Sequence, residues 1–120
     1  MSTPTIRSCT SPDADLWSWV PDSAADVYLL VELEIGERGV DGADIFSLLI
    51  ATPEALRARA ADGTSVLLGR GSLVVAQFDW PDIWEKIQAL VASCAAETWG
   101  ETCWKLQRHF CWEYESFQVN

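Results

Sequence analysis

The sequence predicts an α+β fold, with a mainly antiparallel sheet of four to five strands and two or three helices packed on one face. Alternating apolar stretches indicate strands, and a glycine-rich stretch between two of them indicates a hairpin. Apolar residues at helical spacing follow later in the chain. The 120 residues fit one domain, in which residues 1–26 form an irregular acidic N-terminal segment.

The first half of the chain is expected to supply three strands. A short strand is predicted near residues 5–9, and the clearest one covers residues 27–35. Its alternation places Val27, Leu29, Val31, Leu33 and Ile35 toward the core, and Glu32 and Glu34 toward solvent. Residues 36–43 contain three glycines and predict a hairpin loop. The loop returns into residues 44–51, which are apolar on both faces as in an interior strand.

Helices and shorter strands are expected to alternate in the second half. Thr52 caps a helix over residues 53–61, with a proline at the first helical position, and residues 72–78 form a further strand. Asp79 is expected to cap a helix with apolar residues at helical spacing through position 94. Thr98 and Glu101 match a capping box for a helix to about residue 108, and residues 111–117 alternate as a closing strand.

The seven tryptophans divide into two groups. Those at positions 80, 84, 99, 104 and 112 fall at capping or core-facing positions and are expected to be mostly core residues, with Trp104 packing beside Cys103 and Leu106. Trp17 and Trp19 lie in the irregular acidic segment, where core packing explains them less well.

The charge of the chain restricts its partners. The net charge is −10, and the stretch between Arg7 and Arg38 holds seven carboxylates and no base. Such a field repels phosphate backbones and anionic membranes, so nucleic acid and membranes are not expected as partners. It attracts cationic surfaces such as those of nucleases. No apolar stretch resembles a signal or membrane span, so a cytoplasmic location is expected, with the four cysteines as reduced thiols.

The residues that could support catalysis form no recognisable set. Cys94, Cys103, His109 and Cys111 include no Cys-x-x-Cys pair, so no metal is expected, although spacing alone leaves a Cys-His pair open. Glu32 with Glu34, and Glu113 with Glu115, are spaced as ordinary neighbours on one strand face. We expect no catalytic residue, no cofactor and no metal, and we interpret these pairs as a binding surface.

Four pieces of the chain together resemble the immunity protein 8 family of bacterial polymorphic toxin systems. They are Thr52-Pro53-Glu54-Ala55-Leu56; Gly69-Arg70 with the later Phe78-Asp79-Trp80 and Ile83; Glu97-Thr98-Trp99-Gly100-Glu101 with Leu106; and Trp112-Glu113-Tyr114-Glu115. The resemblance runs from about residue 27 to residue 117. It implies an α+β protein that is made beside a toxin gene and protects its own cell by binding that toxin, and it identifies neither the toxin nor the contact residues.

The charge pattern and the resemblance lead to one functional hypothesis. The protein is expected to be an immunity protein, not an enzyme, that neutralises a cognate toxin domain with a basic surface by stoichiometric occlusion; a nuclease fits this charge. A cytoplasmic adaptor and a small carboxylate-dependent enzyme are the alternatives. The residues expected to contact the partner are Glu32, Glu34, Glu37, Asp41 and Asp44 around the hairpin, with Glu113 and Glu115 on the last strand.

Overall fold

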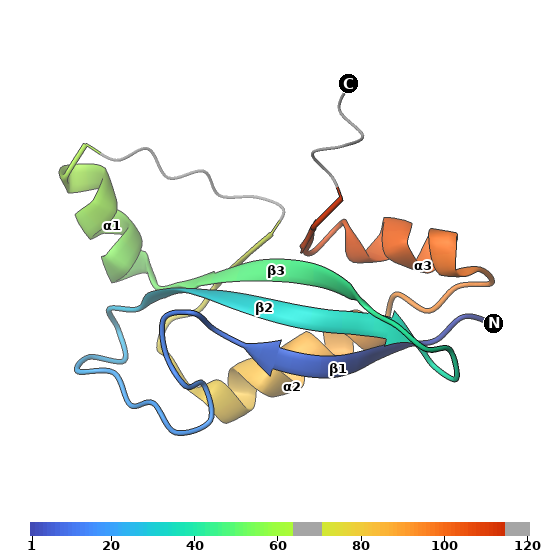
Figure 1. Ribbon diagram of the computed structural model, residues 1–120. Coiled ribbons are helices and arrows are strands. Elements are labelled where there is room, and N and C mark those ends of the chain that lie inside the picture. The colour runs from blue at the N-terminus through green and yellow to red at the C-terminus, as the bar shows by residue number, and fades with distance from the viewer. Residues whose placement is uncertain (64–70, 115–120) are drawn as a thin grey trace.

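The centre of the molecule is a sheet whose first three strands are antiparallel neighbours in chain order. The computed structural model describes residues 1–63 and 71–114, and in it β1 (Pro4–Thr10) pairs with β2 (Tyr28–Glu37), which pairs with β3 (Asp44–Ala51). The other edge of β3 carries two short strands end to end: β4 (Ser72–Val74) runs parallel to it and β5 (Cys111–Trp112) antiparallel (Figure 1). The α+β prediction is confirmed, with a sheet that is mixed at this edge.

The alternation predicted for the second strand is present. Leu29, Val31, Leu33 and Ile35 are each at most 2% exposed, and they share the inner face of the sheet with the buried Phe46, Leu48 and Ile50 of β3. Glu32 and Glu34 point to the opposite face. A slip of one residue would move the whole apolar set into water, so the apolar pattern fixes the register.

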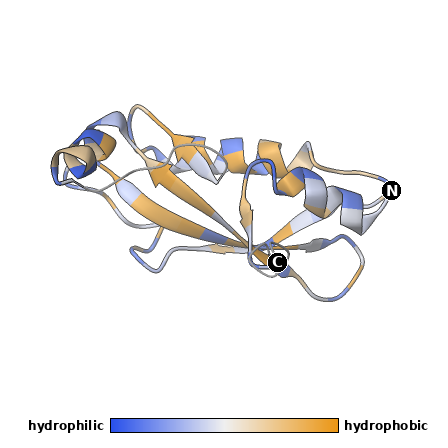
Figure 2. Ribbon diagram, turned by 90° about the horizontal axis from the view of Figure 1, so that it is seen from above, coloured by the Kyte–Doolittle hydropathy of each residue, from blue (hydrophilic) through white to orange (hydrophobic). Residues whose placement is uncertain are grey.

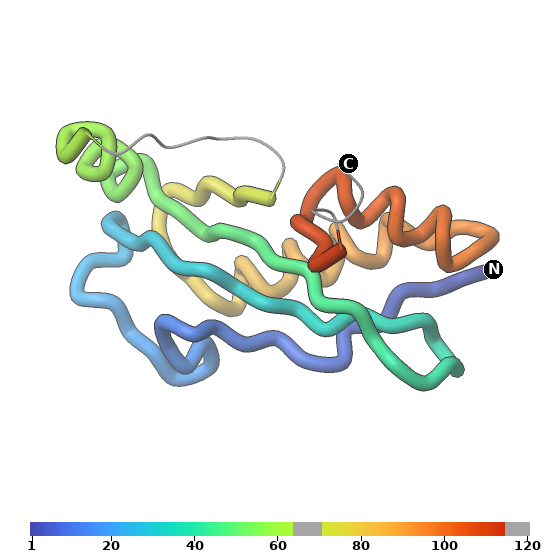
Figure 3. Tube along the Cα trace, turned by 45° about the horizontal axis from the view of Figure 1, so that its top comes forward, coloured from blue at the N-terminus to red at the C-terminus, as the bar shows by residue number. Residues whose placement is uncertain are grey.

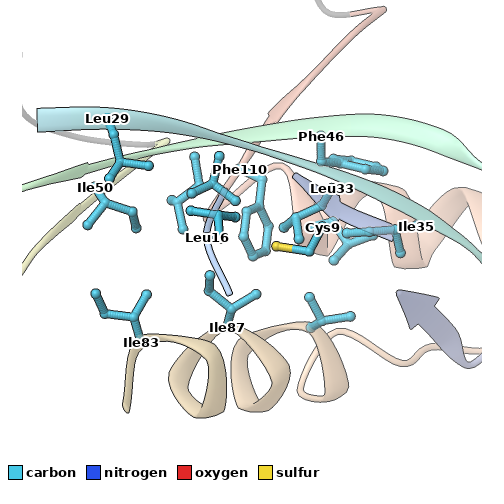
Figure 4. Close-up of a cluster of buried hydrophobic side chains, with 14 of the residues drawn as sticks. Cys9, Leu16, Leu29, Leu33, Ile35, Phe46, Ile50, Ile83, Ile87 and Phe110 are labelled. Atoms are coloured by element: carbon cyan, nitrogen blue, oxygen red, sulfur yellow. The ribbon is translucent and has the colours of Figure 1, made fainter. Parts of the chain in front are cut away.

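One helix covers the inner face and completes the core. Helix α2 (Trp80–Ala92) lies against the sheet (Figure 1), and its buried residues Ile83, Ile87 and Val91 belong to the core cluster. Phe110 lies between the strands and this helix (Figure 4). Helix α3 (Trp99–Leu106) contributes Cys103 and Leu106 to the same cluster. Figure 2 shows the hydrophobic residues gathered along the central strands and α2.

Helix α1 (Pro53–Ala61) is attached to the sheet mainly through its cap. The Thr52 hydroxyl accepts hydrogen bonds from the backbone N–H of Ala55 at 3.4 Å and of Val27 at 3.0 Å. Ala55 is the one buried residue of the helix. Arg59 stacks on the Tyr28 ring, with its guanidinium carbon 3.4 Å from the ring centroid. The predicted cap is confirmed, and it ties the start of β2 to the end of β3.

Two predicted elements differ from the structure near the start of α2. The strand expected over residues 72–78 ends at Val74, and its last sheet bond runs from the N–H of Val75 to the carbonyl of Ala51. Beyond that point β3 has ended, so no partner backbone continues beside it. Asp79 occupies the N-cap position of α2, but its side chain makes no capping hydrogen bond. Pro81 at N2 has no N–H, which removes one of the two donors that such a cap uses.

The expectation that Trp104 packs in the core is wrong, because 66% of its surface is exposed on α3. Its helical neighbours Cys103 and Leu106 are buried, as expected. Thr98 does cap this helix, since its hydroxyl accepts the N–H of Glu101 at 3.2 Å. Within residues 1–63 and 71–114 no helix combines the length and hydropathy needed to cross a membrane.

Candidate functional site

The β2–β3 hairpin is held in shape by backbone geometry and by one arginine. Gly39 and Gly42 have φ values of 81° and 95°, a region that favours glycine. From the neighbouring strand, the Arg7 guanidinium donates to the carbonyl of Glu37 at 3.0 Å and to that of Val40 at 2.6 Å. The N–H of Val40 donates to the same Glu37 carbonyl. Arg7 therefore braces the loop through two of its backbone carbonyls.

The fixed hairpin brings three of the predicted carboxylates to one concave surface. Glu37, Asp41 and Asp44 line a cavity of about 350 Å³ together with loop residues and the half-buried Trp99 of α3. We call this site the hairpin hollow, defined by Gly36, Glu37, Val40, Asp41, Gly42, Ala43, Asp44 and Trp99. Its lining combines negative charge with one aromatic ring, a composition suited to a cationic side chain of a partner.

The carboxylates of the hairpin hollow affect the pKa of a buried thiol, Cys103. The pKa of Cys103 on α3 is raised to about 11, mainly by burial and in addition by the negative charges of Asp44 and Glu37. The two carboxylates therefore lie close enough to α3 to act electrostatically on its buried side. At neutral pH the Cys103 thiol is protonated, which removes it as a nucleophile.

The remaining predicted acids lie outside the hairpin hollow. Glu32 and Glu34 are on the outer face of the sheet, where Glu34 accepts a hydrogen bond from the Ser8 hydroxyl at 2.7 Å. Glu113 follows β5, and one of its carboxylate oxygens accepts the backbone N–H of Ile45 at 3.0 Å. We call Glu32, Glu34 and Glu113 the sheet-face acids. Glu115 lies outside the described residues.

The predicted patch is thus divided between two sides of β2. Strand parity puts Glu37 on the same side as the buried Ile35, whereas Glu34 points the other way. Asp44 is the β3 partner of Ile35 and belongs with Glu37. The structure therefore brings Glu37, Asp41 and Asp44 together, and separates them from the sheet-face acids.

Two contributors to the hairpin hollow were not predicted. Trp99, which follows the capping residue Thr98, was expected in the core. Arg7 was named only as the residue at which the acidic stretch begins. Both act across elements distant in sequence, so local spacing carries no signal for them. The pairing of β1 with β2 was the one available clue, since it places Arg7 beside the start of the hairpin.

The described residues offer little for metal chemistry. Within residues 1–63 and 71–114, no group of three or more His, Cys, Asp or Glu side chains is arranged to hold a metal ion. Burial also raises the pKa of the Cys9 thiol to about 12, and it raises that of Cys94.

Comparison with known protein families places the chain among known sequences. A family model described as Immunity protein 8 matches residues 4–117, which is nearly the whole chain. No curated protein and no solved structure matches. The matched range includes the hairpin, all three helices and the strands that flank them.

Proposed function

The chain belongs to the immunity protein 8 family, and from this membership together with the hairpin hollow we propose that it binds and neutralises a cognate bacterial toxin domain. The proposed mechanism is stoichiometric occlusion in the cytoplasm of the cell that makes the toxin. The hairpin hollow docks onto a basic surface of the toxin domain. No bond is made or broken in this process.

The observation that carries the proposal is the convergence of Glu37, Asp41 and Asp44 around Trp99 in one concave site. Interfaces gain most of their affinity from a few anchored contacts, and aromatic and arginine side chains are the commonest anchors. An arginine or lysine of the toxin could enter the hairpin hollow and meet both the carboxylates and the ring. The loop needs little reordering on binding, because Arg7 already fixes it.

The sign of the charge supports a toxin that acts on nucleic acid. A nuclease carries a basic surface because its substrate is a polyanion. The immunity protein has a net charge of −10, so long-range attraction would speed the encounter between the two. The sheet-face acids would add to this attraction without touching the toxin.

Charge reversal in the hairpin hollow tests the proposal. The partner in this test is the proposed cognate toxin domain, whose gene we expect beside this one. In a variant with Glu37→Lys and Asp41→Lys, we expect the association rate at low salt to fall about 10- to 100-fold. The salt dependence of binding should become shallower, because fewer favourable charges remain to be screened. Surface plasmon resonance at several salt concentrations measures both quantities.

A matched variant separates local from general charge effects. Glu54→Lys with Asp62→Lys changes the net charge equally but lies on α1, at the two ends of one helix, where the dipole effects of the two changes oppose each other. We expect this variant to retain most of the wild-type affinity and to protect co-expressing cells from the toxin. Equal losses in both variants would remove the hairpin hollow from the proposal. Failure of the wild-type protein to bind the toxin domain or to rescue growth would overturn the function itself.

A further inference from the structure

A second concave surface lies at the opposite end of the sheet from the hairpin. The segment of residues 11–26, between β1 and β2, loops out beside the start of α2, whereas the hairpin lies at the far end of β2 (Figure 3). Trp17 and Trp19 of this segment line a cavity of about 460 Å³ with Phe78, Trp80 and Trp84. We call it the tryptophan groove. At about 3.3 Å per residue, the ten residues of β2 separate the two sites by roughly 30 Å.

The rings of the tryptophan groove form an ordered arrangement. Trp80 stacks between Phe78 and Trp84, with ring centroids 6.4 and 6.0 Å away. Trp17 stands edge-on to Trp80 and Trp84, at 5.3 and 5.2 Å. Its own surface is 59% exposed, so one ring of the groove is largely available to a partner. An indole face carries the negative part of the ring quadrupole and attracts a cation above it.

The segment that carries Trp17 is held in place by hydrogen bonds. The carbonyl of Asp15 accepts the N–H groups of Ser18 and Trp19, and the Asp15 carboxylate accepts the N–H of Trp17 at 3.2 Å. Asp13 accepts the N–H of Leu30 on β2 at 3.0 Å, and the N–H of Phe78 donates to the carbonyl of Ala24 at 2.7 Å. The groove is thus formed before any partner arrives.

Both chain segments that supply the rings of the groove carry carboxylates next to the lining residues in sequence. Asp15 and Asp22 flank the stretch that carries Trp17 and Trp19, and Asp79 and Asp82 flank Trp80 and Pro81. The Asp79 side chain makes no capping hydrogen bond to α2. The 11–26 segment contains no base, and the first base after Asp79 is Lys86 on α2. Aromatic rings on acidic segments of the chain are complementary to a cationic side chain.

We propose that the tryptophan groove binds an arginine side chain presented by the toxin domain, as a second contact separate from the hairpin hollow. This rests on the proposed function, because it takes the toxin as the occupant. Arginine fits better than lysine, since its planar guanidinium can stack on a ring and still present N–H donors to the carboxylates of these segments. A second copy of this chain is disfavoured, because each copy carries a charge of −10.

Peptide binding tests the groove without the toxin. The probes are three blocked Gly-Ser peptides that differ only in a central arginine, lysine or citrulline. In ¹H–¹⁵N spectra of the full chain, the Trp17 indole N–H should shift most with the arginine peptide, less with lysine and not at all with neutral citrulline. An Asp79→Asn, Asp82→Asn variant keeps every ring and should weaken the arginine shift. Equal shifts from arginine and citrulline peptides, or no shift at millimolar peptide, would overturn the proposal.

Toxin binding tests the occupant, with a matched tryptophan as control. Trp17→Ala should weaken toxin binding about 30-fold, as loss of an aromatic anchor does. Trp104→Ala removes an indole that is 66% exposed on α3 and lies outside the groove, and it should change affinity less than about threefold. Melting curves show whether Trp17→Ala has also unfolded the chain. If it has, the two asparagine substitutions provide the same test.

The outcomes distinguish this proposal from the function on which it rests. Wild-type toxin binding that Trp17→Ala leaves unchanged overturns the groove as a contact and preserves the immunity function. No binding by the wild-type chain overturns both the function and the toxin as occupant, while the peptide shifts still decide whether the groove takes arginine. A dimer that Trp17→Ala converts to a monomer in sedimentation would make a second copy the occupant, against the proposal.

Discussion

The hairpin end and the tryptophan end of the sheet both present carboxylates, but different forces hold them in shape. At the hairpin end, glycines in the left-handed region and the Arg7 hydrogen bonds fix the backbone. At the tryptophan end, hydrogen bonds also hold the 11–26 segment, and five aromatic rings add a packed contact between this segment and the start of α2. The hairpin should therefore tolerate side-chain changes and resist backbone changes, and the tryptophan end should behave in the opposite way.

The largest expected effect is at the tryptophan end. Phe78 is 8% exposed, stacks on Trp80 and meets the edge of Trp19 at 5.1 Å. Phe78→Ala should lower the free energy of unfolding by about 3–5 kcal/mol, since it removes a buried ring and leaves a cavity. Val40→Ala at the exposed hairpin tip should change it by less than about 0.5 kcal/mol. Urea denaturation measures both, and similar values for the two would refute the contrast.

At the hairpin, a substitution that crowds the backbone should cost more stability than the side-chain truncation Val40→Ala. A Cβ on Gly36 would lie 2.4 Å from the carbonyl oxygen of Gly42 and 3.1 Å from the Arg7 guanidinium. Because a backbone carbonyl cannot rotate away as a side chain does, Gly36→Ala should destabilise the protein by about 1–3 kcal/mol. It should also shift the amide resonances of the loop.

The control is the same substitution in a helix. Gly100 lies in the first turn of α3, and its new Cβ would have only the Thr98 hydroxyl at 4.0 Å as a neighbour. Gly100→Ala should stabilise by up to about 1 kcal/mol, because alanine has the higher helix propensity. Destabilisation by both substitutions would mean that the close contact at Gly36 is not the cause.

Sequence patterns predicted the parts of the fold that local physics determines. The alternation in residues 27–35, the glycine-rich hairpin and the caps at Thr52 and Thr98 each depend on neighbours within a few positions, and the structure contains all of them. The early end of β4 depends on where β3 stops. The exposure of Trp104 depends on which side of a short helix faces the core, and the adjacent apolar residues Cys103 and Trp104 left that choice open.

The candidate site was predictable in composition but not in geometry. The carboxylates were identified from their density, yet their division across β2 follows from the hairpin geometry that turns Glu37 toward Trp99. The tryptophan groove was less predictable still, because Trp17 and Trp84 are distant in sequence and meet only through the folded core. The sequence showed only that core packing explains Trp17 less well than the other tryptophans, and it gave no partner for this ring.

The smallest expected effect is a change in the pKa of one buried thiol, Cys103, relative to that of another, Cys9. Burial alone raises the pKa of Cys9 to about 12, whereas the pKa of Cys103, about 11, also includes the charges of Asp44 and Glu37. A Glu37→Gln, Asp44→Asn variant should lower the pKa of Cys103 and leave that of Cys9 unchanged. More Cys103 thiolate would then be present at any pH below that pKa, so its alkylation by iodoacetamide should accelerate relative to Cys9, as followed by mass spectrometry.

The same thiols set the sign of an alkaline effect on stability. The folded state raises the pKa of Cys103 above the ordinary thiol value of 9.0, so between pH 9 and about 11 it binds more protons than the unfolded state. The stability that this thiol contributes is fully present below pH 9 and is lost as the pH rises toward 11. In the Glu37→Gln, Asp44→Asn variant the pKa of Cys103 is raised less, so the stability lost between pH 9 and about 11 should be smaller. An unchanged rate of Cys103 alkylation in that variant would mean that Glu37 and Asp44 lie too far from α3 to affect Cys103. Because Trp99 is on the same helix, the carboxylates would then also be too far from Trp99 to form the hairpin hollow with it.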